Sequence, residues 1–167
     1  ILAALYGPLA IYVAVQIGNV RISFGSLPVV IAALLFGPLE AILTAMIGEF
    51  FKQILTYGFA YTTFLYLIPP ALRGAVIGAA AIASMRHGRR LEDRRGLYYA
   101  VCVLAAVATT TGNTLVNWLD SVLLDYYTPA LIFGDAAYRF AVGMLNAVII
   151  ASIATPLVQQ LRRRRVV

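Results

Sequence analysis

The stretch RISFGSLPVVIAALLFGP, residues 21–38, decides the class of fold. An arginine and two serines open it, a long apolar run follows, and Gly37-Pro38 closes it. The Gly-Pro pair predicts a break in the apolar run, because proline starts helices well and disrupts their interiors. The stretch therefore predicts a turn-rich loop, a short membrane helix and the start of a second helix.

The whole chain has the composition of a membrane protein. It has 167 residues, of which 62% are hydrophobic, whereas about 45–50% is usual for a soluble domain. Apolar runs of about 20 residues recur, and each is long enough to cross a bilayer core of about 30 Å. We expect an all-α integral membrane protein, one domain over residues 1–167. Six transmembrane helices are expected, at residues 2–18, 27–36, 38–56, 62–85, 97–120 and 135–160.

Arginine gives the expected orientation. Of the 13 basic residues, nine lie in two clusters. The positive-inside rule places both clusters in the cytoplasm, and six spans then place both termini there. Lipid headgroups and topology explain this charge better than nucleic acid does. The clusters are Arg86, Arg89, Arg90, Arg94 and Arg95, and Arg162 to Arg165; the outer loops are residues 19–26, 56–61 and 121–134.

Polar side chains recur in the outer halves of the predicted spans. Such residues are costly in lipid and by default mark a function or a buried partner. Glu49 and Gln53 are four residues apart and share a helical face, with Lys52 beside them. Together with polar residues of later spans and the tyrosines of the outer loops, they predict a small-molecule pocket open to the outside. The later residues are Arg73, Asn113, Asn117, Trp118, Arg139 and Asn146.

A purely structural interpretation of these residues stays open. Glu49 and Lys52 would then pair with each other. The remaining contacts would join Arg73 or Arg139 to Asp120 or Asp135, and would use Asn113 and Asn117 as links between helices.

The first span carries a stripe of small residues. Ala10, Ala14 and Gly18 follow a strict four-residue step, and such faces let another helix approach closely. The stripe suits either internal packing or a partner subunit.

With these features the chain resembles the S components of energy-coupling factor (ECF) vitamin transporters. The resemblance rests on the six short spans, the Ala10-xxx-Ala14 step, and RISFGSLPVVIAALLFGP followed by IGEFFKQ. TTFLYLIPPALRG and the asparagine-rich fifth span look most like the folate-specific members.

The resemblance implies a function in the plasma membrane of a bacterium. An S component binds its vitamin from outside and docks onto a membrane coupling subunit driven by two cytoplasmic ATPases, so the chain itself is expected not to be an enzyme. Ala10, Ala14 and Gly18 would form the docking surface, and the first outer loop would cover the pocket. Folate would be the transported substrate, with no cofactor. The expected substrate-binding residues are Arg21, Ser23, Glu49, Lys52, Gln53, Tyr57, Tyr61, Asn113, Asn117, Trp118 and Arg139.

Several alternatives remain open. Similar scaffolds carry cobalamin, a queuosine precursor or pantothenate. A stand-alone secondary transporter would need an ion relay, for which Glu49 is the one candidate carboxylate, and often an internal repeat, which the chain does not show. An intramembrane enzyme is disfavoured because no catalytic motif is present. His87 and Cys102 are the only residues of their types, so the sequence predicts no metal site.

Overall fold

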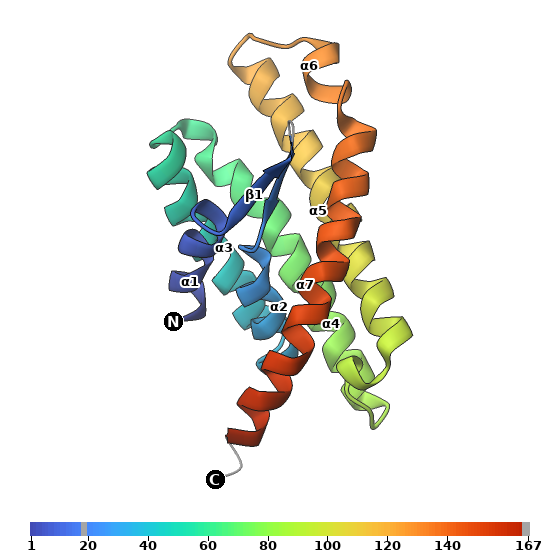
Figure 1. Ribbon diagram of the computed structural model, residues 1–167. Coiled ribbons are helices and arrows are strands. Elements are labelled where there is room, and N and C mark those ends of the chain that lie inside the picture. The colour runs from blue at the N-terminus through green and yellow to red at the C-terminus, as the bar shows by residue number, and fades with distance from the viewer. Residues whose placement is uncertain (18–19, 165–167) are drawn as a thin grey trace.

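The computed structural model describes residues 1–17 and 20–164, apart from the side chains of residues 15–17, 20–22 and 131. Figure 1 shows helices along most of this length and one small hairpin. The elements are α1 (Leu2–Ile11), β1 (Ala14–Ile17), β2 (Val20–Ser23), α2 (Ser26–Leu35), α3 (Pro38–Tyr57), the 3-10 helix η1 (Tyr61–Leu67), α4 (Ile68–Arg86), the 3-10 helix η2 (Leu91–Asp93), α5 (Arg95–Leu123), α6 (Pro129–Phe133) and α7 (Ala136–Arg164).

The expected helical membrane bundle is confirmed. Within the described residues, three helical stretches are long and apolar enough to cross a bilayer: Tyr61–Arg86, Arg95–Leu123 and Ala136–Arg164. The helices α1 and α2 are apolar but have only 10 residues each, so each is about 15 Å long. Both pack against α3 and against each other, and α2 also packs against α4 and α7.

The expected first span, residues 2–18, is wrong in its second half. α1 ends at Ile11, and the chain turns into an antiparallel hairpin in which Ala14 lies opposite Ser23. The physical reason is local: Val13, Val15 and Ile17 alternate with smaller or polar residues, a period of two that favours a strand over a helix.

This correction also changes the stripe of small residues. Ala10 lies in α1 and Ala14 in β1, so the two are not on one helical face; Gly18 lies outside the described residues. Ala10 is buried, and a Cβ added to Gly25 would come within 2.7 Å of its Cβ. Ala10 therefore packs inside the molecule, where the absence of a side chain at Gly25 lets the segment after the hairpin come close to α1.

The predicted break at Gly37-Pro38 is confirmed. Gly37 has a φ of 109°, which favours glycine, and Pro38 is the first residue of α3. Gly78 lets α4 come very close to the start of α3, because a Cβ added to Gly78 would lie 2.4 Å from the Pro38 Cα. Small residues continue this close packing through the bundle, since Ala41, Ala105 and Ala151 are fully buried.

The two ends of the bundle differ. The hairpin, the turn from α3 to η1 and the short α6 gather at one end of the molecule, the upper end in Figure 1. The C-terminal end of α7 and the connection from α4 to α5, which carry the described arginines of the two clusters, lie at the other end; Arg165 lies outside the described residues. This arrangement places the expected outer loops together, and the candidate site lies beneath them.

Candidate functional site

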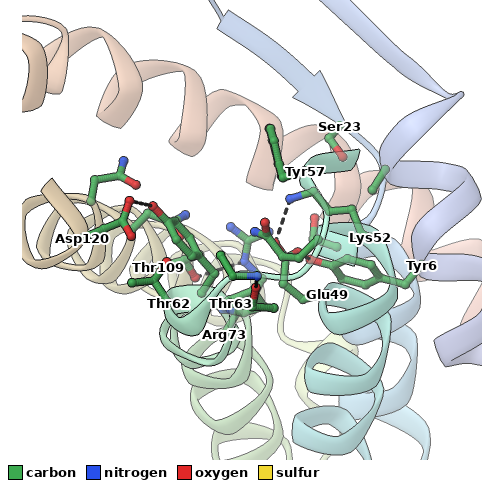
Figure 2. Close-up of a pocket in the computed structure, with 18 of the residues that line it drawn as sticks. Tyr6, Ser23, Glu49, Lys52, Tyr57, Thr62, Thr63, Arg73, Thr109 and Asp120 are labelled. Atoms are coloured by element: carbon green, nitrogen blue, oxygen red, sulfur yellow. Dashed lines mark hydrogen bonds and ion pairs between the residues drawn. The ribbon is translucent and has the colours of Figure 1, made fainter. Parts of the chain in front are cut away.

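A cavity of about 780 Å³ lies between the hairpin, η1 and the helices α1, α2, α3, α4, α5 and α7. Cavities of about 300–1,000 Å³ are typical of small-molecule sites. Figure 2 shows that polar side chains from distant parts of the chain converge on it. Its wall contains three cations and two carboxylates: Lys52, Arg73, Arg139, Glu49 and Asp120.

Glu49, on α3, is the centre of a buried hydrogen-bond network. Its Oε1 accepts from Lys52 Nζ at 2.7 Å and from Gln53 Nε2 at 2.8 Å. Its Oε2 accepts from the Tyr6 hydroxyl at 2.7 Å. The expected shared face of Glu49 and Gln53 is therefore confirmed, and the ion pair between Glu49 and Lys52 that the structural interpretation offered is present. Both oxygens of this carboxylate are occupied by the protein's own donors.

A glycine makes this network possible. A Cβ added to Gly48 would lie 2.4 Å from both the Cβ and the Cγ of Tyr6. Only a residue without a side chain lets α1 approach α3 so closely. The approach delivers the Tyr6 hydroxyl to the neighbouring Glu49.

Arg73, on α4, reaches the cavity between the two carboxylates (Figure 2). Its Nε donates to Thr109 Oγ1 of α5 at 3.2 Å. Among the described residues no carboxylate lies within ion-pair distance of its guanidinium. The purely structural interpretation, which would pair Arg73 with Asp120 or Asp135, is therefore not supported here, and Arg73 is a cation in the cavity wall without an ionic partner among the described residues.

Asp120, near the end of α5, is 7% exposed. Its Oδ2 accepts from Tyr66 of η1 at 3.1 Å and from Tyr126, in the turn after α5, at 2.5 Å. The hydrogen bond to this carboxylate is the main reason that the pKa of Tyr126 is raised, to about 12. The phenol therefore stays protonated, and so remains a donor, throughout the physiological pH range.

The α7 side of the cavity is tied to the hairpin. Asn146 Nδ2 donates to the Ser23 carbonyl at 3.1 Å, and Arg139 donates to the Ile132 carbonyl. Arg139 also has no carboxylate within ion-pair distance among the residues with described side chains. The ionic pairing that the structural interpretation would give Arg139 is therefore also not found among these residues.

The cavity brings together most of the residues that the sequence singled out. Tyr61 and Trp118 do not line it: their side chains are 95% and 41% exposed. The side chain of Arg21 lies outside the described residues. The expected residues that do line the cavity are Ser23, Glu49, Lys52, Gln53, Tyr57, Asn113, Asn117 and Arg139.

The sequence reasoning missed several residues of the wall. Tyr6 and Tyr66 were not expected there, and Asp120 was considered only as an ion-pair partner. One signal was available: Thr109, Asn113, Asn117 and Asp120 line the cavity from α5 and recur at the spacing of one helical face. Tyr6 carried no such signal, because its place depends on the close approach of α1 to α3.

The sequence was compared with known proteins and with models of protein families. None of the curated proteins that were compared matches the chain. A family model described as ECF-type riboflavin transporter, S component, matches residues 1–163, nearly the whole chain. A polar cavity in a bundle of short and long apolar helices fits such a transport subunit. The chain therefore belongs to the family of ECF-type riboflavin transporter S components.

Proposed function

We propose that this protein is the vitamin-binding subunit of an ECF importer and that its ligand is a folate. The observation that carries the choice of ligand is Arg73, a partly buried cation in the cavity wall with no carboxylate partner among the described residues. A charge removed from water needs a partner of opposite sign. A ligand with an anionic group supplies that partner, and the carboxylates of folate are such groups.

The rest of the wall suits the remainder of a folate. Tyr57 and Tyr66 offer aromatic faces to a flat ring. The amides of Gln53, Asn113 and Asn117 line the same space, and each amide both donates and accepts hydrogen bonds. A pterin ring, which carries both kinds of polar group, matches such a wall.

We further propose that the cavity opens outward and that both termini are cytoplasmic, in the plasma membrane of a bacterium. The described arginines of the two clusters support this orientation, because they lie at the end of the bundle opposite the hairpin and the cavity. Transport then requires a membrane coupling subunit and two cytoplasmic ATPases. The part of α1 left exposed for such a partner is small and apolar, with Ala4, Leu5 and Pro8 on its surface.

Riboflavin is the second candidate ligand, because the matching family model is described by that vitamin. Riboflavin has no charged group, so it would leave Arg73 without an anion. The amides of the wall would suit the carbonyl and N–H groups of its ring.

Calorimetric titration of the purified chain with folate and with riboflavin tests the proposal. Folate is expected to bind at one per chain. Arg73→Gln is expected to weaken folate binding by at least about tenfold, the loss of one charged hydrogen bond, and to leave riboflavin binding unchanged. Arg86→Gln, which removes the same charge from the exposed end of α4, is the matched control. Tight binding of riboflavin without binding of folate would overturn the proposal.

A further inference from the structure

Three buried side-chain atoms of the described residues have no hydrogen-bond partner: Asp120 Oδ1, Arg139 Nε and Asn146 Oδ1. All three belong to residues that line the one cavity described above. Buried polar atoms are nearly always hydrogen-bonded in folded proteins. Their gathering here indicates that a bound molecule completes the set, and that it carries N–H or O–H donors as well as acceptors.

We propose that Asp120 accepts the N–H donors of the ligand's ring and so fixes the direction in which the ligand lies. The ring end lies against Asp120, and the anionic end lies against Arg73. This inference rests on the proposed function, because it takes the ligand to be a folate.

Asp120 has acceptor capacity that its protein hydrogen bonds do not use. An ionised carboxylate accepts through two oxygens, with about four lone-pair sites. Among the described residues, Tyr66 and Tyr126 donate hydrogen bonds to Asp120, and both bonds go to Oδ2. The Thr62 hydroxyl also faces the carboxylate but forms no hydrogen bond of normal geometry to Oδ1. Oδ1 therefore has no hydrogen-bond partner among the described residues, and the soft χ2 torsion of aspartate lets either oxygen turn toward the cavity.

The charge of Asp120 is also uncompensated. No cation of the described side chains lies within ion-pair distance of it, and its partners are neutral hydroxyls. Glu49, the other carboxylate of the wall, has Lys52 beside it and donors on both oxygens. Asp120, and not Glu49, is thus the carboxylate that has acceptor capacity left for a ligand.

The distance between the two ends follows from α5. Arg73 is bonded to Thr109, and Thr109 and Asp120 are eleven residues apart on one helix. Eleven residues span about 16 Å and about three turns, so both residues lie on nearly the same face. The ligand that satisfies both charges is therefore elongated. Folate has this form, because a p-aminobenzoyl unit separates its pterin ring from its carboxylates.

The chemistry of the ring edges makes Asp120 a specificity residue. A pterin presents a ring N–H and an amino group side by side, and two adjacent donors match a carboxylate. The corresponding edge of a flavin presents one N–H between two carbonyl oxygens, which repel a carboxylate. Asp120 therefore favours a pterin over a flavin.

Two fragments of folate separate its ends: pteroate, which has the pterin but lacks the glutamate, and p-aminobenzoylglutamate, which lacks the pterin. Asp120→Asn is expected to weaken binding of folate and of pteroate by at least about tenfold and to change that of p-aminobenzoylglutamate less than twofold. Arg73→Gln is expected to weaken the binding of p-aminobenzoylglutamate more than the binding of pteroate. Asp125→Asn, in the exposed turn after α5, is the matched control and should change the binding of neither fragment.

A ligand-side test needs no mutation. The unaltered protein should bind 2-desaminofolate, which lacks the amino group, at least about tenfold more weakly than folate. The inference is wrong, and the proposed function stands, if folate binds but 2-desaminofolate binds as tightly as folate and the Asp120→Asn variant binds folate as tightly as the unaltered protein. If Asp120→Asn weakens p-aminobenzoylglutamate instead of pteroate, the orientation is reversed and the inference is also overturned. Absence of folate binding by the unaltered protein would defeat the proposed function itself.

Discussion

The two carboxylates of the cavity wall have opposite surroundings. Glu49 lies where α1, α3 and the cavity meet, with a cation, an amide and a phenol on its two oxygens. Asp120 lies on the far side, with two phenols hydrogen-bonded to Oδ2 and no hydrogen-bond partner for Oδ1 among the described residues. The residues are chemically alike, so their partners decide what each does. Glu49 holds two helices together, and Asp120 keeps its acceptor capacity for a ligand.

The cavity has a tightly packed side, around Glu49, and a more open side, around Asp120. On the Glu49 side, Gly48 and Tyr6 leave no room between α1 and α3. On the Asp120 side, Tyr126 comes from an exposed turn and Tyr66 from a 3-10 helix. We therefore expect substitutions on the first side to change stability, and substitutions on the second side to change binding.

The largest effect on stability is expected for Glu49→Ala. It leaves Lys52 without its ionic partner and Tyr6 without an acceptor. A loss of about 3 kcal/mol in the free energy of unfolding is expected, at the low end for a broken buried pair, because the Lys52 side chain keeps 24% exposure. Denaturant unfolding in detergent measures it. Glu40→Ala, at an exposed site of the same helix, is the control, and equal losses would remove Glu49 from its structural role.

Gly48→Ala should come next. The added methyl would overlap the Tyr6 side chain, at 2.4 Å from its Cβ, and overpacking of this kind costs about 1–3 kcal/mol. Gly96→Ala, in α5, meets no atom within 4 Å and should leave stability equal or higher, because alanine favours a helix. The difference between the two melting temperatures gives the result, and a Gly48→Ala variant as stable as Gly96→Ala would contradict the close approach of α1.

Tyr6→Phe should have a smaller effect. It removes only the hydrogen bond to Glu49 Oε2, worth about 1.5 kcal/mol, the low end for a hydrogen bond to a charged group. Folate affinity should change less than threefold, because Glu49 keeps Lys52 and Gln53. Unfolding and calorimetry on the same sample check both statements. A large loss of affinity with unchanged stability would place Tyr6 in the ligand contacts.

The smallest effect on binding is expected for Trp118→Ala, because this side chain lies outside the cavity. Folate affinity should stay within about twofold of the parent protein. Asn117→Ala, one residue earlier and in the cavity wall, should weaken binding several-fold through loss of a hydrogen bond. If Trp118→Ala weakens binding more than Asn117→Ala does, the placement of this face of α5 is wrong.

Local rules predicted a large part of this fold. The break at Gly37-Pro38, the lengths of the later helices and the shared face of Glu49 and Gln53 depend on proline chemistry, hydropathy and helical spacing. The hairpin after Ile11 was missed because its β-branched residues are as apolar as the helix before it, and hydropathy alone does not tell such runs apart.

The site was harder to predict, for physical reasons. Trp118 was expected in the pocket as an aromatic residue beside Asn117, but neighbours in a helix point about 100° apart. The free oxygen of Asp120 depends on residues from three separate segments. No spacing in the sequence shows which oxygens those donors occupy. The three-dimensional arrangement was needed to tell the two carboxylates apart.

The measurement that tests the account most directly is an experimental structure of the chain with folate bound. We expect the pterin within hydrogen-bond distance of Asp120, a glutamate carboxylate on Arg73, and Glu49 still bonded to Tyr6, Lys52 and Gln53. A pterin that displaces Lys52 or Gln53 from Glu49, while Asp120 makes no contact with the ligand, would contradict it.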